Sequence, residues 1–263
     1  MILHNDLKKT LRENLLALYY NVNAGHIACS LSCIDLLIAL FDVKTKTERV
    51  ILSKGHAAAA LYTVLNSTGE INDETLKTFY QNGTKLSAHP SANSFENIPF
   101  ALGSLGHGFP IGCGIAYANK LEHNTDLVYV LMSDGETNEG TTWEAAHFAA
   151  TKQLDNIVVL IDKNNLQGFG ETKDVLGDSS DFKKWESLGF DIHEVNGHEI
   201  DEIQSAITNL SQLKNGKPKL IIANTTKGKG VTYMENKLEW HYLPMNEEMY
   251  REALESLEIN YHA

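Results

Sequence analysis

Hydrophobic residues follow helical spacing in the first part of this chain. Between Asn5 and Val22 apolar side chains return every three or four residues, which predicts an amphipathic helix. A second helix is expected from about Ser32 to Phe41, and a short strand at 49–53 leads into an Ala-rich helix that ends near Leu65. The segment 105–121 is rich in Gly and Ala, which predicts a helix that approaches a neighbouring element closely.

From residue 127 onward, short apolar runs alternate with amphipathic stretches. Strands are expected at 127–132, 157–162, 190–195 and 219–224, helices at about 139–151 and 199–213, and a loop with a short helix at 163–188. Repeated β-α-β units predict an α/β fold, a parallel sheet with helices on both faces. We expect a single domain over residues 1–263, with a loop and helical extension from about residue 225.

Composition narrows the class of protein. The chain has 263 residues, of which 43% are hydrophobic and 21% charged, as is usual for a globular protein with a sizeable core. Its net charge of −12 argues against a general nucleic-acid surface, so an anionic ligand would need a local cation. Cys29 and Cys33, at i,i+4 spacing, are expected to be buried thiols. The charged N-terminus resembles neither a signal peptide nor a membrane span, and we expect a cytoplasmic protein.

Oxygen-bearing side chains follow two of the predicted strands. Ser133-Asp134-Gly135 comes after the first, and Asn164-Asn165 after the second. The carboxyl ends of parallel strands meet at one edge of a sheet, where α/β proteins bind ligands. Oxygen ligands suit Mg²⁺, which is often held by one or two side chains plus phosphate oxygens. We therefore predict a Mg²⁺-diphosphate site at Asp134 and Asn164. The alternative is that both residues serve only as turn formers and caps.

This region resembles the thiamine diphosphate enzymes, and the transketolase family in particular. The matching segment runs from Ser133-Asp134-Gly135-Glu136-Thr137-Asn138-Glu139-Gly140 to Asp162-Lys163-Asn164-Asn165. Further matches extend over nearly the whole chain: Ala24-Gly25-His26, Ser53-Lys54-Gly55-His56-Ala57, His89-Pro90, Gly103-Ser104-Leu105-Gly106-His107-Gly108, and Lys227-Gly228-Lys229-Gly230-Val231 with Trp240-His241. The last pair is similar to transketolases that are split into two polypeptides.

The resemblance implies thiamine diphosphate as cofactor, with Mg²⁺, or Ca²⁺ or Mn²⁺ in its place. Asp134, Asn164 and the backbone carbonyl of Leu166 would hold the metal. Cofactor contacts are implied for a larger set, namely His56, Gly103, Ser104, Leu105, Asp134, Gly135 and Asn164. The missing side chain of Gly135 would let the diphosphate approach the backbone.

Three histidines are expected to contact the sugar substrate. By resemblance, His26, His89 and His241 would line a sugar channel and transfer protons, which suits a side chain whose charge changes near neutral pH. Glu139 would take part in a carboxylate link between cofactor sites; its alternative is an acid stabilised by a helix N-terminus. His107 replaces a Gln of the family, whereas His147 and His193 match no motif and are expected to be structural or surface groups.

Departures from the family pattern cluster around the expected sugar channel. Ser133 stands where Gly is usual, Ile27 and Ala28 replace Pro-Gly, Ser91 replaces an acid, and Tyr242 replaces a Gly. The metal ligands are unchanged. We therefore expect cofactor binding to be retained and the donor or acceptor preference to differ.

The activity implied is transfer of a two-carbon ketol unit from a ketose or ketose phosphate to an aldose. The family's chemistry also needs a pyrimidine-binding domain, so we expect the N-terminal subunit of a split transketolase. It would act only with a second polypeptide that carries the pyrimidine-binding and C-terminal domains, in an α2β2 assembly. Alternatives are the α subunit of a 2-oxo acid dehydrogenase, a deoxyxylulose phosphate synthase, a non-catalytic cofactor-binding subunit, and a Mg²⁺-dependent phosphohydrolase.

Overall fold

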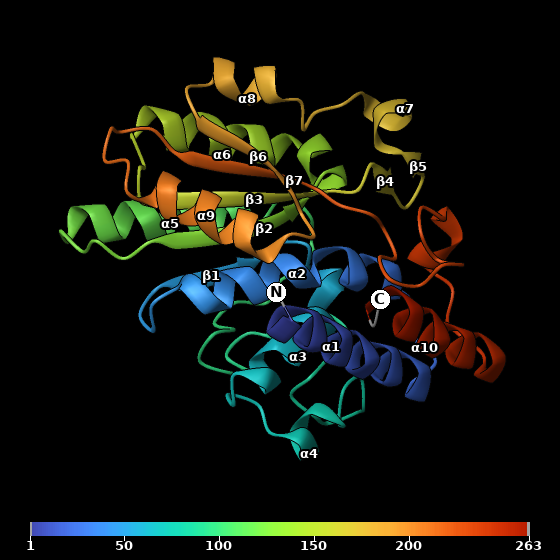
Figure 1. The fold of residues 1–263 in the computed structure, drawn as a ribbon. Coiled ribbons are helices and arrows are strands. Elements are labelled where there is room, and N and C mark those ends of the chain that lie inside the picture. Colours follow the sequence, from blue (N-terminus) through green and yellow to red (C-terminus); the bar gives the residue numbers. More distant parts are fainter. Residues whose placement is uncertain (1, 262–263) are drawn as a thin grey trace.

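A five-stranded sheet forms the centre of the computed structural model, which describes residues 2–261 (Figure 1). The spatial order is β1 (Arg49–Leu52), β2 (Val128–Ser133), β3 (Ile157–Lys163), β7 (Lys219–Asn224) and β6 (Asp191–Asn196). Every neighbouring pair in this sheet is parallel. A separate antiparallel hairpin joins β4 (Leu166–Gln167) and β5 (Gly170–Glu171). The predicted α/β fold with a parallel sheet is confirmed.

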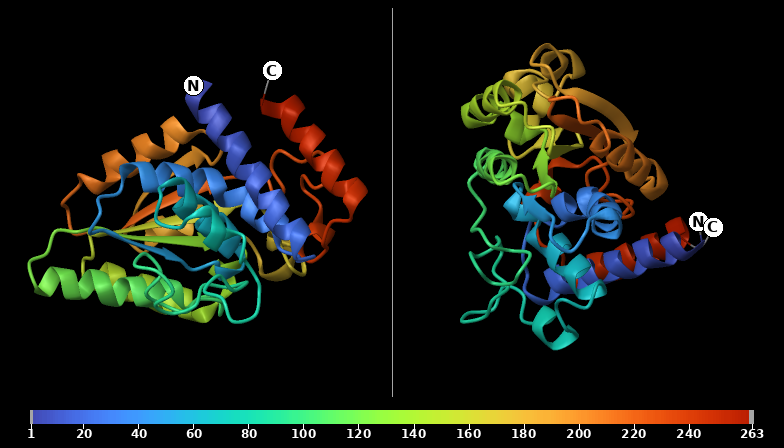
Figure 2. Two further views of the ribbon diagram at one scale, coloured as in Figure 1. Left: turned by 90° about the horizontal axis from the view of Figure 1, so that it is seen from below. Right: turned by 90° about the vertical axis from the view of Figure 1, so that its left-hand side faces the viewer.

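Alternating side chains of the strands fill two cores. In β2, Val128 and Val130 belong to one core, and Tyr129 and Leu131 to the other. The first core is covered by α5 (Gly108–Leu121), α6 (Gly140–Thr151) and α8 (Phe182–Ser187), and the second by α2 (Ile27–Val43), α3 (Ala58–Ser67) and α9 (Ile200–Ser211). Figure 2 shows these helices on the two sides of the sheet. Burial on both faces explains why β2, β3 and β7 are continuous apolar runs, whereas the edge strand β6 is largely exposed.

The two ends of the chain meet on the α2 side of the sheet. Helices α1 (Ile2–Asn21) and α10 (Glu247–Tyr261) lie side by side (Figures 1 and 2), and the rings of Tyr20 and Tyr250 stack with centroids 4.5 Å apart. The segment between β7 and α10 includes a 3₁₀ turn, Leu238–His241, and returns to the N-terminal turn at His26. Two short helices, α4 (Asp73–Leu76) and α7 (Thr172–Leu176), lie in connecting segments. None of the helices between residues 2 and 261 combines the length and apolar character that a membrane span requires.

Two predicted helix boundaries were wrong. Helix α2 begins at Ile27 instead of Ser32, because the completely buried Ile27 and Ala28 already belong to its apolar face. Helix α5 begins at Gly108 instead of residue 105, because Gly106 has a φ of +75° that cannot belong to a right-handed helix. The close approach predicted for α5 is present: a Cβ added at Gly112 would lie 2.6 Å from the Cγ2 of Val130 in β2. Cys29 and Cys33 are buried thiols, as predicted.

Candidate active site

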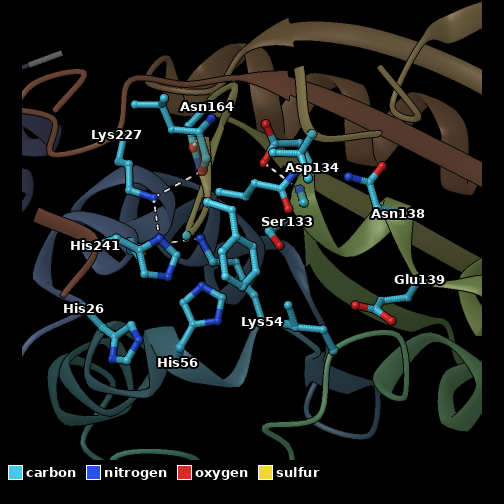
Figure 3. Close-up of a pocket in the computed structure, with 18 of the residues that line it drawn as sticks. His26, Lys54, His56, Ser133, Asp134, Asn138, Glu139, Asn164, Lys227 and His241 are labelled. Atoms are coloured by element: carbon cyan, nitrogen blue, oxygen red, sulfur yellow. Dashed lines mark hydrogen bonds between the residues drawn. The ribbon is translucent and has the colours of Figure 1, made fainter. Parts of the chain in front are cut away.

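A pocket of about 460 Å³ opens at the carboxyl edge of the sheet (Figure 3). Its walls come from the start of α2, the loops after β1, β2 and β3, the segment between α4 and α5, and the segment after β7. Register explains the convergence, since Ser133 at the end of β2 pairs with Asp162 near the end of β3. The strand-end residues predicted from the sequence therefore do lie at one edge, where parallel sheets bind ligands.

Asp134 and the turn that begins at Asn164 are in direct contact. One oxygen of Asp134, Oδ2, accepts hydrogen bonds from the Asn165 N–H at 2.6 Å and the Thr172 hydroxyl at 3.1 Å. The other, Oδ1, accepts from the Gly135 N–H at 2.8 Å. Asn164 Oδ1 accepts from the Leu166 N–H at 3.1 Å. The structure thus brings the three predicted metal-ligand residues, Asp134, Asn164 and Leu166, into one small region.

Electrostatics at Asp134 favour a bound cation. Burial, followed by the negative charge of Asp162, raises the pKa of Asp134 to about 6. A divalent ion would offset this buried negative charge, and metal binding in turn requires the deprotonated carboxylate. Within residues 2–261 no group of three or more His, Cys, Asp or Glu side chains is arranged to hold a metal ion. The predicted set contains only one such residue, Asp134, beside an amide and a carbonyl oxygen, and it stays a prediction.

Two side-chain amides in the pocket fit an oxygen-rich ligand. Asn138 Nδ2 and Gln167 Nε2 are buried and have no hydrogen-bond partner, and both residues line the pocket. Buried donors are normally satisfied, so both are available to acceptor oxygens such as those of a diphosphate. Together with the oxygens at Asp134, Asn164 and Leu166, they fit a diphosphate bound through a divalent ion.

Gly135 is required by packing. A Cβ added there would lie 2.9 Å from the Cβ of Gln167, so a larger residue would displace the β4–β5 hairpin. Its predicted role beside a diphosphate remains a prediction.

Two buried lysines supply positive charge. Lys227 Nζ donates to the carbonyl oxygen of Leu166 at 3.1 Å and lies 2.9 Å from Nδ1 of His241 (Figure 3). Lys54 forms an ion pair with Asp162 and donates to the carbonyl of Cys29 at 3.0 Å. Both lysines line the pocket. Lys227 contacts a carbonyl and an imidazole, so its charge is available to an anionic ligand, whereas the charge of Lys54 is balanced by Asp162. Neither lysine was predicted to have a role, although both stand in Lys-Gly segments that match the family.

The four predicted histidines lie close together. The ring centroid of His26 is 5.6 Å from that of His56, 6.1 Å from that of His89 and 5.4 Å from that of His241. In Figure 3 the labelled histidines lie on one side of the pocket and Glu139 on the opposite side. Because these residues come from four separate segments, their convergence is a property of the tertiary fold.

Burial keeps these imidazoles neutral. Burial, aided by nearby His241, His89 and Lys227, lowers the pKa of His26 to about 4. Burial lowers the pKa of His56 to about 4, and burial with the charge of Lys227 lowers that of His241 to about 3. Burial also lowers the pKa of His89. Near neutral pH each ring can therefore donate one hydrogen bond and accept another.

Cys29 is a pocket residue that sequence reasoning treated only as a buried thiol. Burial raises its pKa, but Lys227, the imidazole of His56 and Lys54 outweigh this effect and hold the pKa at about 6. The two lysines and the imidazole thus favour the ionised form of this sulfur.

The remaining predicted residues lie at the rim. Gly103 and Leu105 line the pocket, whereas Ser104 is exposed and lies outside the lining. Glu139 is exposed and lines the pocket just before α6. His107 is also exposed, with Nδ1 3.0 Å from the carbonyl of Leu105. His147 and His193 lie at the surface, as predicted.

Glu136 was missed by sequence reasoning. It is fully buried, accepts hydrogen bonds from the Gly106 N–H at 2.8 Å and from the Ser53 hydroxyl, and so joins the loop after β1 to the turn before α5. Burial raises its pKa to about 7, which the hydrogen bonds from Ser53 and Gly106 oppose.

Comparison with known proteins identifies a family. A family model described as "Transketolase, thiamine diphosphate binding domain" matches residues 7–262. The chain is 40% identical over 253 residues to one subunit of the apulose-4-phosphate transketolase of Phocaeicola vulgatus, covering 92% of this chain and 89% of the relative. It is 35% identical over 247 residues to the 6-deoxy-6-sulfo-D-fructose transketolase subunit SqwG of a Clostridium species, covering 90% of both chains.

Solved transketolases have the same fold. The structure of the Campylobacter jejuni enzyme superimposes with a TM-score of 0.87 at 30% identity, over 96% of this chain and 42% of that one. Transketolase from Pichia stipitis in complex with sedoheptulose 7-phosphate gives a TM-score of 0.90 at 27% identity, over 100% of this chain and 41% of that one. The chain therefore spans about two fifths of these solved transketolases and most of the relatives named as subunits.

Proposed function

Because this chain belongs to the transketolase thiamine diphosphate-binding domain family, we propose that it is the diphosphate- and magnesium-binding subunit of a two-polypeptide transketolase. The family match favours this reading over the dehydrogenase, synthase and phosphohydrolase alternatives. The reaction would move a two-carbon ketol unit from a ketose or ketose phosphate to an aldose. The relatives named for apulose 4-phosphate and for 6-deoxy-6-sulfo-D-fructose suggest that a specialised sugar is among the candidates to test.

One observation carries the proposal: a single pocket joins an oxygen-lined strand edge, two lysines and four histidines. Asp134, Asn164 and the Leu166 carbonyl would hold Mg²⁺, or Ca²⁺ or Mn²⁺ in its place. Cofactor contacts would come from His56, Gly103, Leu105 and Lys227, with the free amides of Asn138 and Gln167 as further donors. When bound, thiamine diphosphate supplies the electron sink for carbon–carbon cleavage.

The histidines would bind and orient the sugar. As neutral rings, His26, His89 and His241 can each bind a hydroxyl as donor or acceptor. The predicted proton transfer is not favoured in this state, because burial lowers the pKa of each ring and makes it a weaker base than a histidine that titrates near neutral pH. Lys227 lies beside His241 and would keep that ring uncharged. The pocket thus provides a row of neutral polar groups next to a charged diphosphate site, which is the arrangement that a polyhydroxylated substrate needs.

Exposed apolar side chains at the rim of the pocket support the proposal of a partner polypeptide. Phe169 is 85% exposed, Leu176 is 70% exposed and Tyr242 is 55% exposed, and all three line the pocket. Exposed apolar side chains gathered at one place often mark an interface. In our proposal a second polypeptide, with the pyrimidine-binding and C-terminal domains, covers this rim near Glu139 in an α2β2 assembly. Relatives of similar length carry names that make them one subunit of a transketolase, which is consistent with such a division. The single-domain organisation and the cytoplasmic location stay predictions.

Reconstitution tests the proposal. The chain would be purified alone and together with a candidate partner, and both preparations assayed for ketol transfer with thiamine diphosphate, Mg²⁺, a ketose and an aldose. We expect no transfer by the chain alone and Mg²⁺-dependent transfer by the pair. A pair that contains the D134N variant is the matched control and should be inactive. Full turnover by the chain alone would contradict the two-polypeptide part, and pyruvate decarboxylation in place of ketol transfer would contradict the reaction.

A further inference from the structure

A buried ionic cluster lies behind the loop that carries Lys227. Arg12 of α1 donates to both oxygens of Asp35 in α2, from Nη1 at 2.9 Å and from Nη2 at 2.6 Å. His198, in the loop after β6, places Nδ1 2.8 Å from Asp35 Oδ2. The side chains of Arg12 and Asp35 are both 0% exposed. None of these three residues lines the pocket, so the cluster is outside the site described above.

Two hydrogen bonds from this cluster reach the backbone on either side of Lys227. Nε2 of His198 accepts from the N–H of Thr226, which directly precedes Lys227, at 2.8 Å. Nε of Arg12 donates to the carbonyl of Lys229, two residues after Lys227, at 3.3 Å. The cluster therefore holds the stretch of backbone from which the Lys227 side chain projects into the pocket.

The direction of these bonds defines the tautomer of His198. Because Nε2 accepts from an amide, the ring proton must lie on Nδ1, where it is donated to Asp35. Arg12 in turn keeps Asp35 as a charged acceptor. A continuous chain of hydrogen bonds thus runs from Arg12 through Asp35 and His198 to Thr226, and an orienting carboxylate of this kind is how proteins fix a histidine that serves a neighbouring site.

We propose that His198 is a positioning residue for cofactor binding, which acts by holding Lys227 in the pocket wall beside His241. The identity of the ligand as a diphosphate rests on the proposed function. The loop has a second attachment, because the Gly228 N–H donates to the carbonyl of Ala28 at 3.1 Å. Loss of the His198 bond should therefore move Lys227 without unfolding the loop.

A pair of amide variants separates this role from a purely structural one. In H198Q the side-chain oxygen can replace Nε2 as acceptor for Thr226, whereas in H198N the shorter amide can replace only the Nδ1 donor to Asp35. Calorimetric titration of the full chain with thiamine diphosphate and MgCl₂ should show about tenfold weaker binding for H198N and binding within about twofold of wild type for H198Q. If His198 served only to donate a hydrogen bond to Asp35, H198N would bind the cofactor like wild type and H198Q would bind it more weakly. That result would overturn the proposal.

Hydrogen exchange provides a readout that does not depend on the cofactor. The Thr226 amide should exchange faster in H198N than in wild type and stay protected in H198Q. The variant T226P removes the N–H donor of the same hydrogen bond and leaves the buried ions intact. If H198N does not fold, T226P takes its place, and T226P should bind the cofactor about tenfold more weakly than wild type. Equal protection of Thr226 in wild type, H198N and H198Q would overturn the proposal.

A double-variant cycle tests the action through Lys227. If His198 works by placing that lysine, K227M and K227M/H198N should bind the cofactor equally weakly, and independent, additive losses would contradict the proposal. Absence of binding by the wild-type chain, with Thr226 still protected, would count against the proposed function and not against the hydrogen-bond chain.

Discussion

The ion pair between Lys54 and Asp162 offers a stringent test of the electrostatics beneath the pocket. Lys54 and Asp162 are 1% and 0% exposed, and Asp162 also accepts hydrogen bonds from the hydroxyls of Ser32, at 2.6 Å, and Thr225. The variant K54M would leave a buried carboxylate without its cation. Loss of one partner of a buried pair typically destabilises a protein by about 3–5 kcal/mol. Since both hydroxyl bonds remain, we expect a loss near the lower end, about 3 kcal/mol at neutral pH.

The double variant K54M/D162N removes the orphaned charge as well. It should be more stable than K54M by about 2 kcal/mol, because replacement of both members of a buried pair is far less harmful than removal of one. Urea unfolding followed by circular dichroism measures all three proteins. The exposed pair of Lys173 and Glu171 gives the control, since K173M should leave the unfolding midpoint unchanged. The reasoning would be refuted if K54M were as stable as wild type, or if the double variant were no more stable than K54M.

Three further predictions concern the channel, the histidines and the rim. Y242G should change the KM for the ketose several-fold without changing cofactor affinity. Y242F keeps the ring, which lies 6.0 Å from that of His26, and should have the KM of wild type. The same KM in Y242G and Y242F would contradict a role of this ring in the channel. Burial lowers the pKa of His56 from 6.5 to about 4, so the unfolded chain takes up the proton first as pH falls. Wild-type stability should therefore decrease between those pH values, by at most about 1.4 kcal/mol per pH unit from this group, and urea unfolding of H56N should show a shallower decrease. F169D should weaken capture of the partner polypeptide about tenfold without changing the stability of the chain. The control is L121D, at a residue that is 63% exposed and outside the pocket lining, and it should capture the partner as well as wild type does. Equal capture by F169D and L121D would contradict the proposed interface.

The sequence predicted the sheet and its ligand-binding edge well. Strands such as β2 and β3 are buried on both faces, so their apolar runs are unambiguous, and parallel topology then places Asp134 and Asn164 at one edge. The start of α2 was predicted too late because nothing in the sequence marks it. The residue before it, His26, has a left-handed φ of 71° and makes no side-chain cap.

Side-chain contacts over long sequence separations could not be predicted. The Gly-His and Trp-His motifs indicated His26 and His241, but only the return of the C-terminal segment shows that their rings lie 5.4 Å apart. The same return brings Lys227 to the Leu166 carbonyl. His198 lies in no motif that the sequence singled out, and its importance follows from a hydrogen bond to Thr226 that depends on the packing of α1, α2 and two loops.

The central claim is that Asp134 and Asn164 hold a divalent ion and, through it, a diphosphate. Calorimetric titration of thiamine diphosphate into wild type and D134N, with MgCl₂ and then with EDTA, tests it most directly, and H147Q at an exposed position provides the control. We predict Mg²⁺-dependent binding by wild type and H147Q, and binding weakened by about 100-fold or more in D134N. Equal affinity of D134N and wild type, or binding that persists in EDTA, would contradict the claim.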